Sequence, residues 1–333
     1  MDPISQGVLG ASAAQSAANR RDMLVALLAG IVGGMAPDLD SLIRSADDPL
    51  LYLEYHRQFT HSLVFIPMGG LLCALVLKPI LRAASFGRIY LFATLGYATH
   101  GLLDSCTTYG TQLFWPFSDA RVAWHVVSII DPLFTLPMVG AVVLASWKRS
   151  AWFARLACGW AVLYLAAGIV QRERAESIGQ EIAAGRSHIG VEIEAKPSFA
   201  NIMVWKIIYA HDGKFYVDAV RLGIRPEVYP GASLDRLDLT RDFPWLDPNS
   251  QQARDVERFR WFSNHHLAVH PRRRDFVIDM RYSLLPNGID GMWGIELNPQ
   301  AAGSEHVRFL WARQVGAPER DALWRMIMGN YQP

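Results

Sequence analysis

Six side chains with metal-ligand chemistry are concentrated between residues 38 and 104. They are three carboxylates and three imidazoles: Asp38, Asp40, Asp104, His56, His61 and His100. Mixed imidazole and carboxylate ligands suit Zn²⁺, Mn²⁺ or Fe²⁺ better than Ca²⁺, which prefers oxygen ligands alone. Six ligands exceed the needs of one tetrahedral ion. The set therefore predicts one or two divalent transition-metal ions, with zinc as the first choice and manganese or iron as alternatives.

The spacing within the first two pairs indicates how their ligands can meet. Asp38 and Asp40 lie two residues apart, and in an extended chain both carboxylates point to one face. His56 and His61 lie five apart, about 140° around a helix, so a shared site requires a non-helical turn between them. Both pairs also have a structural explanation, because paired Asp residues after a proline cap helices and the histidines can belong to a basic loop before a helix.

The third pair lies inside an apolar segment. His100 and Asp104 are four residues apart, so they project from one face of a helix. An ionisable pair among apolar residues is costly unless it is partnered, and it therefore indicates a functional site. A His–Asp hydrogen bond that stiffens a helix bundle is the structural alternative.

Three further residues near these ligands are candidates for catalysis. Arg57 can neutralise a phosphoryl oxygen. Thr60 belongs to the same segment and can instead cap the following helix. His125, in a later polar stretch, is an optional contributor. Asp131 is not among the candidates, because Asp followed by Pro132 is typical of an N-cap and the first residue of a helix.

The elements that must position these residues are apolar helices. Residues 1–170 carry only 11 Lys and Arg and 10 Asp and Glu, and five apolar segments follow one another there. The segments are Met23–Met35, Leu63–Leu77, Ile89–Leu103, Leu133–Trp147 and Trp152–Val170. Only the last approaches the roughly 20 residues that cross a bilayer core. We expect a membrane α-helical bundle of about five apolar helices over residues 1–170; short buried helices of a soluble bundle are the alternative.

Basic residues assign the sides of the membrane if all five segments cross it. They lie before the first segment, between the second and third, and between the fourth and fifth: Arg20, Arg21, Lys78, Arg82, Arg88, Lys148, Arg149 and Arg155. By the positive-inside rule these places face the cytoplasm. The metal ligands and everything after Val170 then face the periplasm. The assignment changes if residues 23–35 re-enter without crossing.

The rest of the chain is more polar. Residues 171–195 are expected to form a helical linker, and residues 196–333 a smaller α+β extramembrane domain with an antiparallel sheet. Within it, Asp212-Gly213 separates two β-rich stretches and predicts a tight hairpin turn. The net charge of the whole chain is only +1, so no nucleic-acid partner is expected.

Three motifs together carry a resemblance to a known family. They are Pro37-Asp38-Leu39-Asp40, His56-Arg57-Gln58-Phe59-Thr60-His61-Ser62 and His100-Gly101-Leu102-Leu103-Asp104, followed by Tyr109-Gly110 and Leu113-Phe114-Trp115-Pro116. In this order they resemble the YdjM-like family of membrane-bound metal-dependent hydrolases. The resemblance covers roughly residues 1–150. It implies a bacterial inner-membrane protein whose helical metal site is distantly similar to that of zinc-dependent phospholipase C.

By the same resemblance, all six acidic and imidazole candidates match metal-binding positions. Gln6 stands where many family members have a histidine, which argues against a three-metal site. The expected function is a multi-pass membrane hydrolase that cleaves a phosphoester or other ester at the membrane surface by metal-activated water. Arg57 would stabilise developing charge and Asp38 or Asp104 would assist proton transfer.

The partners expected for such an enzyme are the lipid bilayer and a lipid-derived or small-molecule substrate; any protein partner is undefined. Two other functions stay open. The chain can be a transporter or a proton or cation relay that uses His100 and Asp104. Alternatively, the metal can be structural and hold the bundle that presents the exterior domain to a protein partner.

Overall fold

The computed structural model of the 333-residue chain describes residues 1–312 and 316–331. These residues form two compact units that do not follow the sequence in two simple blocks. The first unit contains Met1–Ile43, Tyr55–Val170 and Phe199–Ile202. The second contains Arg44–Glu54, Gln171–Ser198 and the described residues from Met203 onward. A short segment between two candidate ligands, Asp40 and His56, thus belongs to the second unit.

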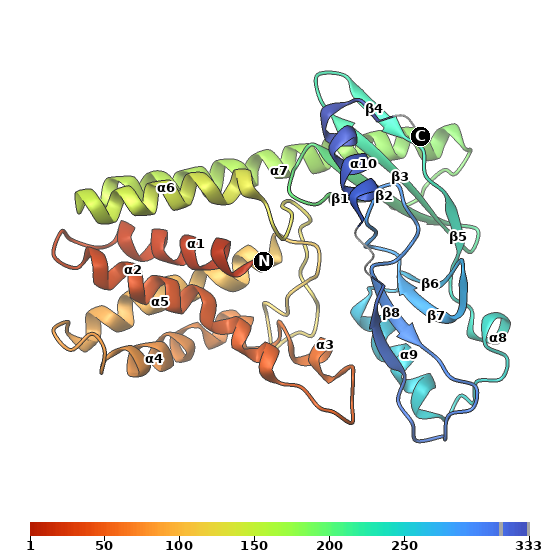
Figure 1. The fold of residues 1–333 in the computed structure, drawn as a ribbon, viewed down its shortest axis with the longest axis horizontal. Coiled ribbons are helices and arrows are strands. Elements are labelled where there is room, and N and C mark those ends of the chain that lie inside the picture. The colour runs from red at the N-terminus through yellow and green to blue at the C-terminus, as the bar shows by residue number, and fades with distance from the viewer. Residues whose placement is uncertain (313–315, 332–333) are drawn as a thin grey trace. The chain divides into compact units, whose positions relative to one another are not determined.

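The first unit is helical (Figure 1). Its longer helices are α1 (Pro3–Ser16), α2 (Met23–Met35), α4 (Ile66–Leu77), α5 (Phe86–Ser105), α6 (Pro132–Lys148) and the apolar part of α7 (Ala151–Gly185). Four short elements complete it or lead out of it: η1 (Ala36–Leu42), α3 (Leu51–Tyr55), η2 (Phe59–His61) and η3 (Leu63–Phe65). Helix α1 packs against α2, α5 and α6, and α5 also packs against α2 and α4.

Small residues allow these helices to approach closely. A Cβ atom on Gly30 of α2 would lie 2.5 Å from the carbonyl oxygen of Gly10 in α1, which no side chain tolerates. Such contacts between small residues are typical of helices that pack in membranes. The helix starts follow local signals. Asp131 accepts hydrogen bonds from the N–H groups of Leu133 and Phe134 at the start of α6, as the Asp-Pro pair predicts.

The expectation of five membrane-crossing helices is not supported. In the described part of the chain, Met23–Leu42 and Ala151–Gly185 are long and apolar enough to cross a membrane. The pair Leu51–His61 and Leu63–Leu77, bent by 57°, makes a third if it is counted as one span. Helix α6 has only 17 residues, and α5, with 20, interrupts its apolar residues with Arg88, His100 and Asp104.

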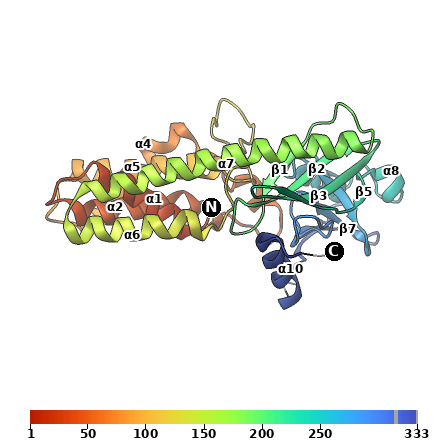
Figure 2. The ribbon, with the colours of Figure 1, turned by 90° about the horizontal axis from the view of Figure 1, so that it is seen from above.

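Helix α7 joins two parts that the sequence treats separately. Its 35 residues run without a break from Ala151 through the apolar segment and into the polar stretch after Val170. Figure 2 shows it as one continuous helix. The polar stretch therefore continues an apolar helix as far as Gly185, and the chain from 186 to 193 is non-helical up to the first strand.

The second unit contains two antiparallel sheets. The first is formed by β1 (Glu194–Pro197), β2 (Val204–His211), β3 (Lys214–Leu222), β4 (Pro226–Tyr229) and β5 (Ser233–Asp235), and the second by β6 (Leu267–His270), β7 (Arg273–Asp279), β8 (Trp293–Glu296) and β9 (Arg308–Trp311). Its helices are α8 (Leu239–Asp242), α9 (Gln251–Phe262) and α10 (Ala317–Met328). Asp212 and Gly213, both with positive φ, form the predicted turn between β2 and β3, where His211 pairs with Lys214.

Candidate metal centre

Asp38 and Asp40 lie on η1, directly after α2. The backbone here is a 3₁₀ helix and not the extended chain from which the sequence argument started, yet Asp38 and Asp40 still bring ligand atoms into one group together with His56. Asp40 is buried, whereas the side chain of Asp38 is 27% exposed. The helical backbone lets the two carboxylates contact different partners.

The turn between His56 and His61 is non-helical, as their spacing required. Helix α3 ends at Tyr55, and Arg57 adopts the left-handed conformation with φ of 68°. Backbone hydrogen bonds stabilise this conformation: the Arg57 N–H donates to Asp40 Oδ2 at 3.1 Å, and the Arg57 carbonyl accepts from Gln112 N–H at 2.9 Å. The turn places the centroids of the two imidazole rings 5.7 Å apart, with the rings edge-on to one another.

His100 and Asp104 share one face of α5, as predicted, and both are fully buried. Gly101 lies between them, and a Cβ atom on it would come within 2.2 Å of the His61 carbonyl oxygen. The absence of a side chain at residue 101 therefore allows the segment with His61 to pack directly on α5. Tyr97, one turn earlier, donates a hydrogen bond to the Thr60 carbonyl at 2.8 Å.

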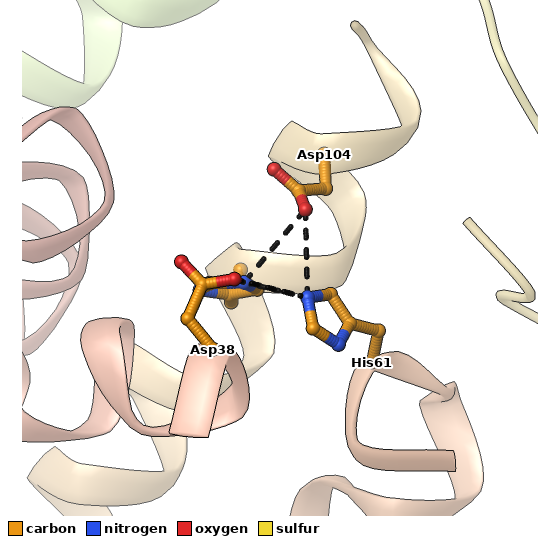
Figure 3. Close-up of side chains that lie close together, drawn as sticks. Asp38, His61 and Asp104 are labelled. Carbon is orange, nitrogen blue, oxygen red and sulfur yellow. Dashed lines mark hydrogen bonds and ion pairs between the residues drawn. The ribbon is translucent and has the colours of Figure 1, made fainter. Parts of the chain in front are cut away.

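Four ligand atoms converge where η1, η2 and α5 meet (Figure 3). His61 Nε2 lies 3.5 Å from Asp38 Oδ1 and 3.4 Å from Asp104 Oδ2. His100 Nε2 lies 3.4 Å and 3.8 Å from the same two oxygens and 2.9 Å from His61 Nε2. Tetrahedral zinc with bonds of about 2.0–2.2 Å separates its ligand atoms by about 3.3–3.6 Å. Three of the five separations lie in this range, while the one between His100 and Asp104 is longer at 3.8 Å and the one between the two histidines is shorter at 2.9 Å.

The hydrogen-bond partners of the two histidines direct their Nε2 lone pairs to the same point. His100 Nδ1 contacts the Gly34 carbonyl at 2.6 Å and must donate to it. His61 Nδ1 faces Asp40 Oδ2 at 3.2 Å and the hydroxyl of Thr60 at 3.0 Å, whose proton is donated to Asp40. It too must donate. Two neutral imidazoles with these partners repel one another at 2.9 Å unless a cation or a proton lies between them.

Asp104 provides a second observation that fits a metal ion. Its Oδ1 accepts from Gln6 Nε2 at 2.8 Å and contacts the amino group of Met1. Its buried Oδ2 accepts no hydrogen bond from the described residues, although Arg57 Nε lies 3.1 Å away. The ion pair with Arg57 compensates part of its charge, and the same oxygen faces the two imidazole nitrogens at 3.4 and 3.8 Å. The donor set and its orientation therefore fit a divalent transition metal.

A second group of three residues adjoins the first. Asp38, Asp40 and His56 also bring ligand atoms within 4.8 Å of one another, and Asp38 belongs to both groups. His56 Nδ1 lies 2.7 Å from Asp40 Oδ1. The structure thus brings all six predicted ligands together, and the shared Asp38 gives the geometry of a bridging ligand between two sites.

The three catalytic candidates differ in their relation to these groups. Arg57 is buried beside Asp104, and its Nη1 donates to Thr107 Oγ1 at 3.2 Å. Thr60 donates to Asp40, so its hydroxyl orients the carboxylate. Within the described residues, His125 belongs to neither metal group. Its backbone N–H donates to the Thr107 carbonyl at 3.4 Å.

Sequence reasoning did not identify the residues that orient the ligands. Gly34 contributes only a carbonyl oxygen, which no side-chain pattern reveals. Tyr97 could have been found, because it lies three residues before His100 and seven before Asp104 and so shares their helix face. The sequence motifs distinguish Gln6 only by its place where many family members have a histidine, whereas in the structure its Nε2 donates to Asp104 Oδ1.

Comparison with known proteins agrees with the motifs in the first unit. The model of the YdjM inner membrane protein family matches residues 1–175, more than half of the chain. The chain belongs to this family. Together with at least two candidate spans, this membership makes the chain an inner-membrane protein.

Two curated relatives share part of the sequence. The inner membrane protein YbcI of Escherichia coli (strain K12) is 39% identical over 107 residues, which cover 31% of this chain and 61% of YbcI. The uncharacterized protein YfhP of Bacillus subtilis (strain 168) is 27% identical over 118 residues, 35% of this chain and 36% of YfhP. The chain thus spans less than two thirds of either relative. No solved structure matches.

Proposed function

We propose that this YdjM-family protein is a membrane hydrolase that depends on a divalent transition metal, with zinc as the first choice. Its substrate is a phosphoester or another ester, lipid-derived or small, that reaches the site at the membrane surface. The observation that carries the proposal is the convergence of Asp38, His61, His100 and Asp104, whose ligand atoms lie within 4.8 Å of one another.

The residues around the centre have separable roles in this proposal. Asp38, His61, His100 and Asp104 would hold the metal ion, which would supply an activated water and positive charge at the reacting oxygen. Arg57 keeps a buried positive charge beside Asp104, where it can bind an anionic oxygen of the substrate. Asp38 is the only partly exposed ligand of the four, so substrate approaches from its side, and its carboxylate is placed to accept a proton.

The side of the membrane is also part of the proposal. If α5 and α6 both cross or neither crosses, the basic residues near Lys78, Arg88 and Lys148 lie on one side of the membrane, which the positive-inside rule assigns to the cytoplasm. The metal centre and the second unit then face the periplasm, where headgroups of the outer leaflet are accessible. His125 stays a candidate for a further catalytic contact.

Metal analysis of detergent-purified protein tests the centre first. Wild type and Asp119→Ala, which changes an exposed acidic residue of the same unit, are expected to carry stoichiometric metal. His61→Ala and Asp104→Ala are expected to lose it. Hydrolysis of a panel of phosphoesters and carboxylic esters should follow metal content. Bound metal without hydrolysis of any ester in the panel contradicts the hydrolase.

A second candidate function has its own observation. The contact of 2.9 Å between His61 Nε2 and His100 Nε2 is also the geometry of a shared proton, as in a proton relay next to Asp104. Folded wild-type protein that binds no divalent metal in the same analysis favours this relay over the hydrolase.

A further inference from the structure

The segment Arg44–Glu54 connects two ligand-bearing elements of the metal centre but belongs to the second unit. The chain leaves the first unit after Ile43, three residues beyond Asp40, and returns to it at Tyr55, one residue before His56. At its base the segment is closed by the contact between His56 Nδ1 and Asp40 Oδ1 at 2.7 Å. Whatever fixes this segment therefore acts on both ligands through a few covalent bonds.

An arginine of α9 binds two carboxylates of the segment. Arg258 binds Asp48 with both Nη atoms, at 3.0 and 2.7 Å, and its Nε donates to Glu54. Its side chain is only 20% exposed. Bidentate, charge-assisted pairs of this kind are among the strongest and most directional hydrogen bonds in proteins.

Arg258 is itself positioned by another residue of α9. Its Nη1 also donates to Asp255 Oδ1 at 2.9 Å, one turn earlier on α9. Asp255 is fully buried and accepts from His306 Nδ1 at 2.8 Å and from Val307 N–H at 3.1 Å. Removal of the guanidinium would take away the cation that Asp48, Glu54 and Asp255 share and leave His306, 4.0 Å from Asp48, so the segment would be bound less firmly to the second unit.

We propose that Arg258 is a positioning residue for the metal centre: it holds segment 44–54 on the extramembrane domain and so sets the relative placement of Asp40 and His56. The metal-affinity part of this inference rests on the proposed metal function. Because coupling between two sites is reciprocal, metal binding also stabilises the contact of the segment with Arg258. The second unit thereby controls the geometry of a centre to which it contributes no ligand.

The test compares Arg258→Gln with Arg260→Gln in the full-length protein in detergent. Arg260 lies on the same helix and pairs with the exposed Glu257, so it is a matched control. In Arg258→Gln we expect faster amide hydrogen exchange in residues 44–54 and in the flanking residues 36–43 and 55–62. We also expect zinc binding weaker by about tenfold, the effect typical of residues that orient ligands.

The double substitution Asp48→Asn with Glu54→Gln removes the same contacts without a change in α9. We expect this double variant to reproduce both effects. It therefore provides the test in case Arg258→Gln impairs folding of the second unit. Unchanged exchange in residues 36–43 and 55–62 overturns the proposal, whether or not metal binds. Faster exchange there with unchanged zinc affinity overturns it as well. Absence of zinc from folded wild type refutes the proposed metal function instead, and the exchange measurement alone then decides on Arg258.

Discussion

At the scale of residues, the centre separates side chains that face a common point from side chains that orient them. His61 and His100 present Nε2 because their Nδ1 atoms are engaged by Asp40 with Thr60 and by the Gly34 carbonyl. Ligating histidines in metalloproteins are commonly fixed through their second nitrogen in this way. The buried acids Asp40 and Asp104 thus differ in role: Asp40 orients His61, whereas Asp104 faces the common point. The sequence presents them as equivalent candidates.

This difference predicts the behaviour of Asp40→Asn. The amide keeps the size of the side chain but removes the charge that holds His61 Nδ1 and the Thr60 hydroxyl. We expect zinc to remain bound at the four-residue group with an affinity lower by about 10–100-fold, whereas Asp104→Ala loses it. Competition with a chelator measures both constants. Equal loss in the two variants would show that Asp40 ligates the first ion directly.

The sequence identified all six acidic and imidazole candidates because their types and the motif order are local properties. The sequence did not show which of the six would face the common point as ligands and which would orient those ligands. That division depends on η1 being a 3₁₀ helix and on the carbonyl of Gly34 lying beside His100, and both depend on contacts with distant parts of the chain.

At the scale of elements, the segment that carries His61 packs directly on helix α5. Gly101 is essential to that contact because any Cβ at this place would overlap the His61 carbonyl, 2.2 Å away. Gly87, near the start of the same helix, has nothing within 4 Å of such an atom. The two glycines therefore form a matched pair for one substitution.

We expect Gly101→Ala to destabilise the first unit by about 1–3 kcal/mol, the usual effect of overpacking, and to weaken zinc binding. Gly87→Ala should be neutral or stabilise by up to about 1 kcal/mol, because alanine favours helix over glycine. Thermal unfolding in detergent, followed by circular dichroism, gives the two midpoints. A midpoint for Gly101→Ala equal to that of wild type would contradict the packing argument.

Local signals predicted local elements well. The turn at Asp212-Gly213 and the cap at Asp131 are both confirmed, because each depends on a few adjacent residues. The expected number of membrane-crossing helices is not supported, because α6 has only 17 residues and α5 carries Arg88, His100 and Asp104, so neither qualifies as a span by length and composition.

At the scale of the whole molecule, the proposed orientation can be tested by labelling. Ser304 is exposed in the second unit, and Ser85 is exposed in the connection before α5 that basic residues assign to the cytoplasm. In intact cells an impermeant maleimide should label Ser304→Cys, while Ser85→Cys should react only after the inner membrane is permeabilised. Wild type, whose three cysteines are buried or half-buried, is the blank. The reverse pattern would place the second unit in the cytoplasm.

The division of the chain into units was only partly accessible from the sequence. The drop in hydropathy after Val170 coincides with a boundary between units. The membership of residues 44–54 in the second unit could not be predicted, since it comes from contacts with distant residues such as Arg258, which lies 204 residues after Glu54.

That separation has a consequence for how the protein is made. At about 5–20 residues per second, a ribosome needs about 10–40 s to proceed from Glu54 to Arg258. All six candidate ligands have been synthesised once Asp104 is added, 154 residues before Arg258, and from that point until Arg258 is added segment 44–54 lacks its arginine partner on α9. If Arg258 positions the centre as proposed, the centre of a nascent chain reaches its final form only after nearly four fifths of the polypeptide has been translated.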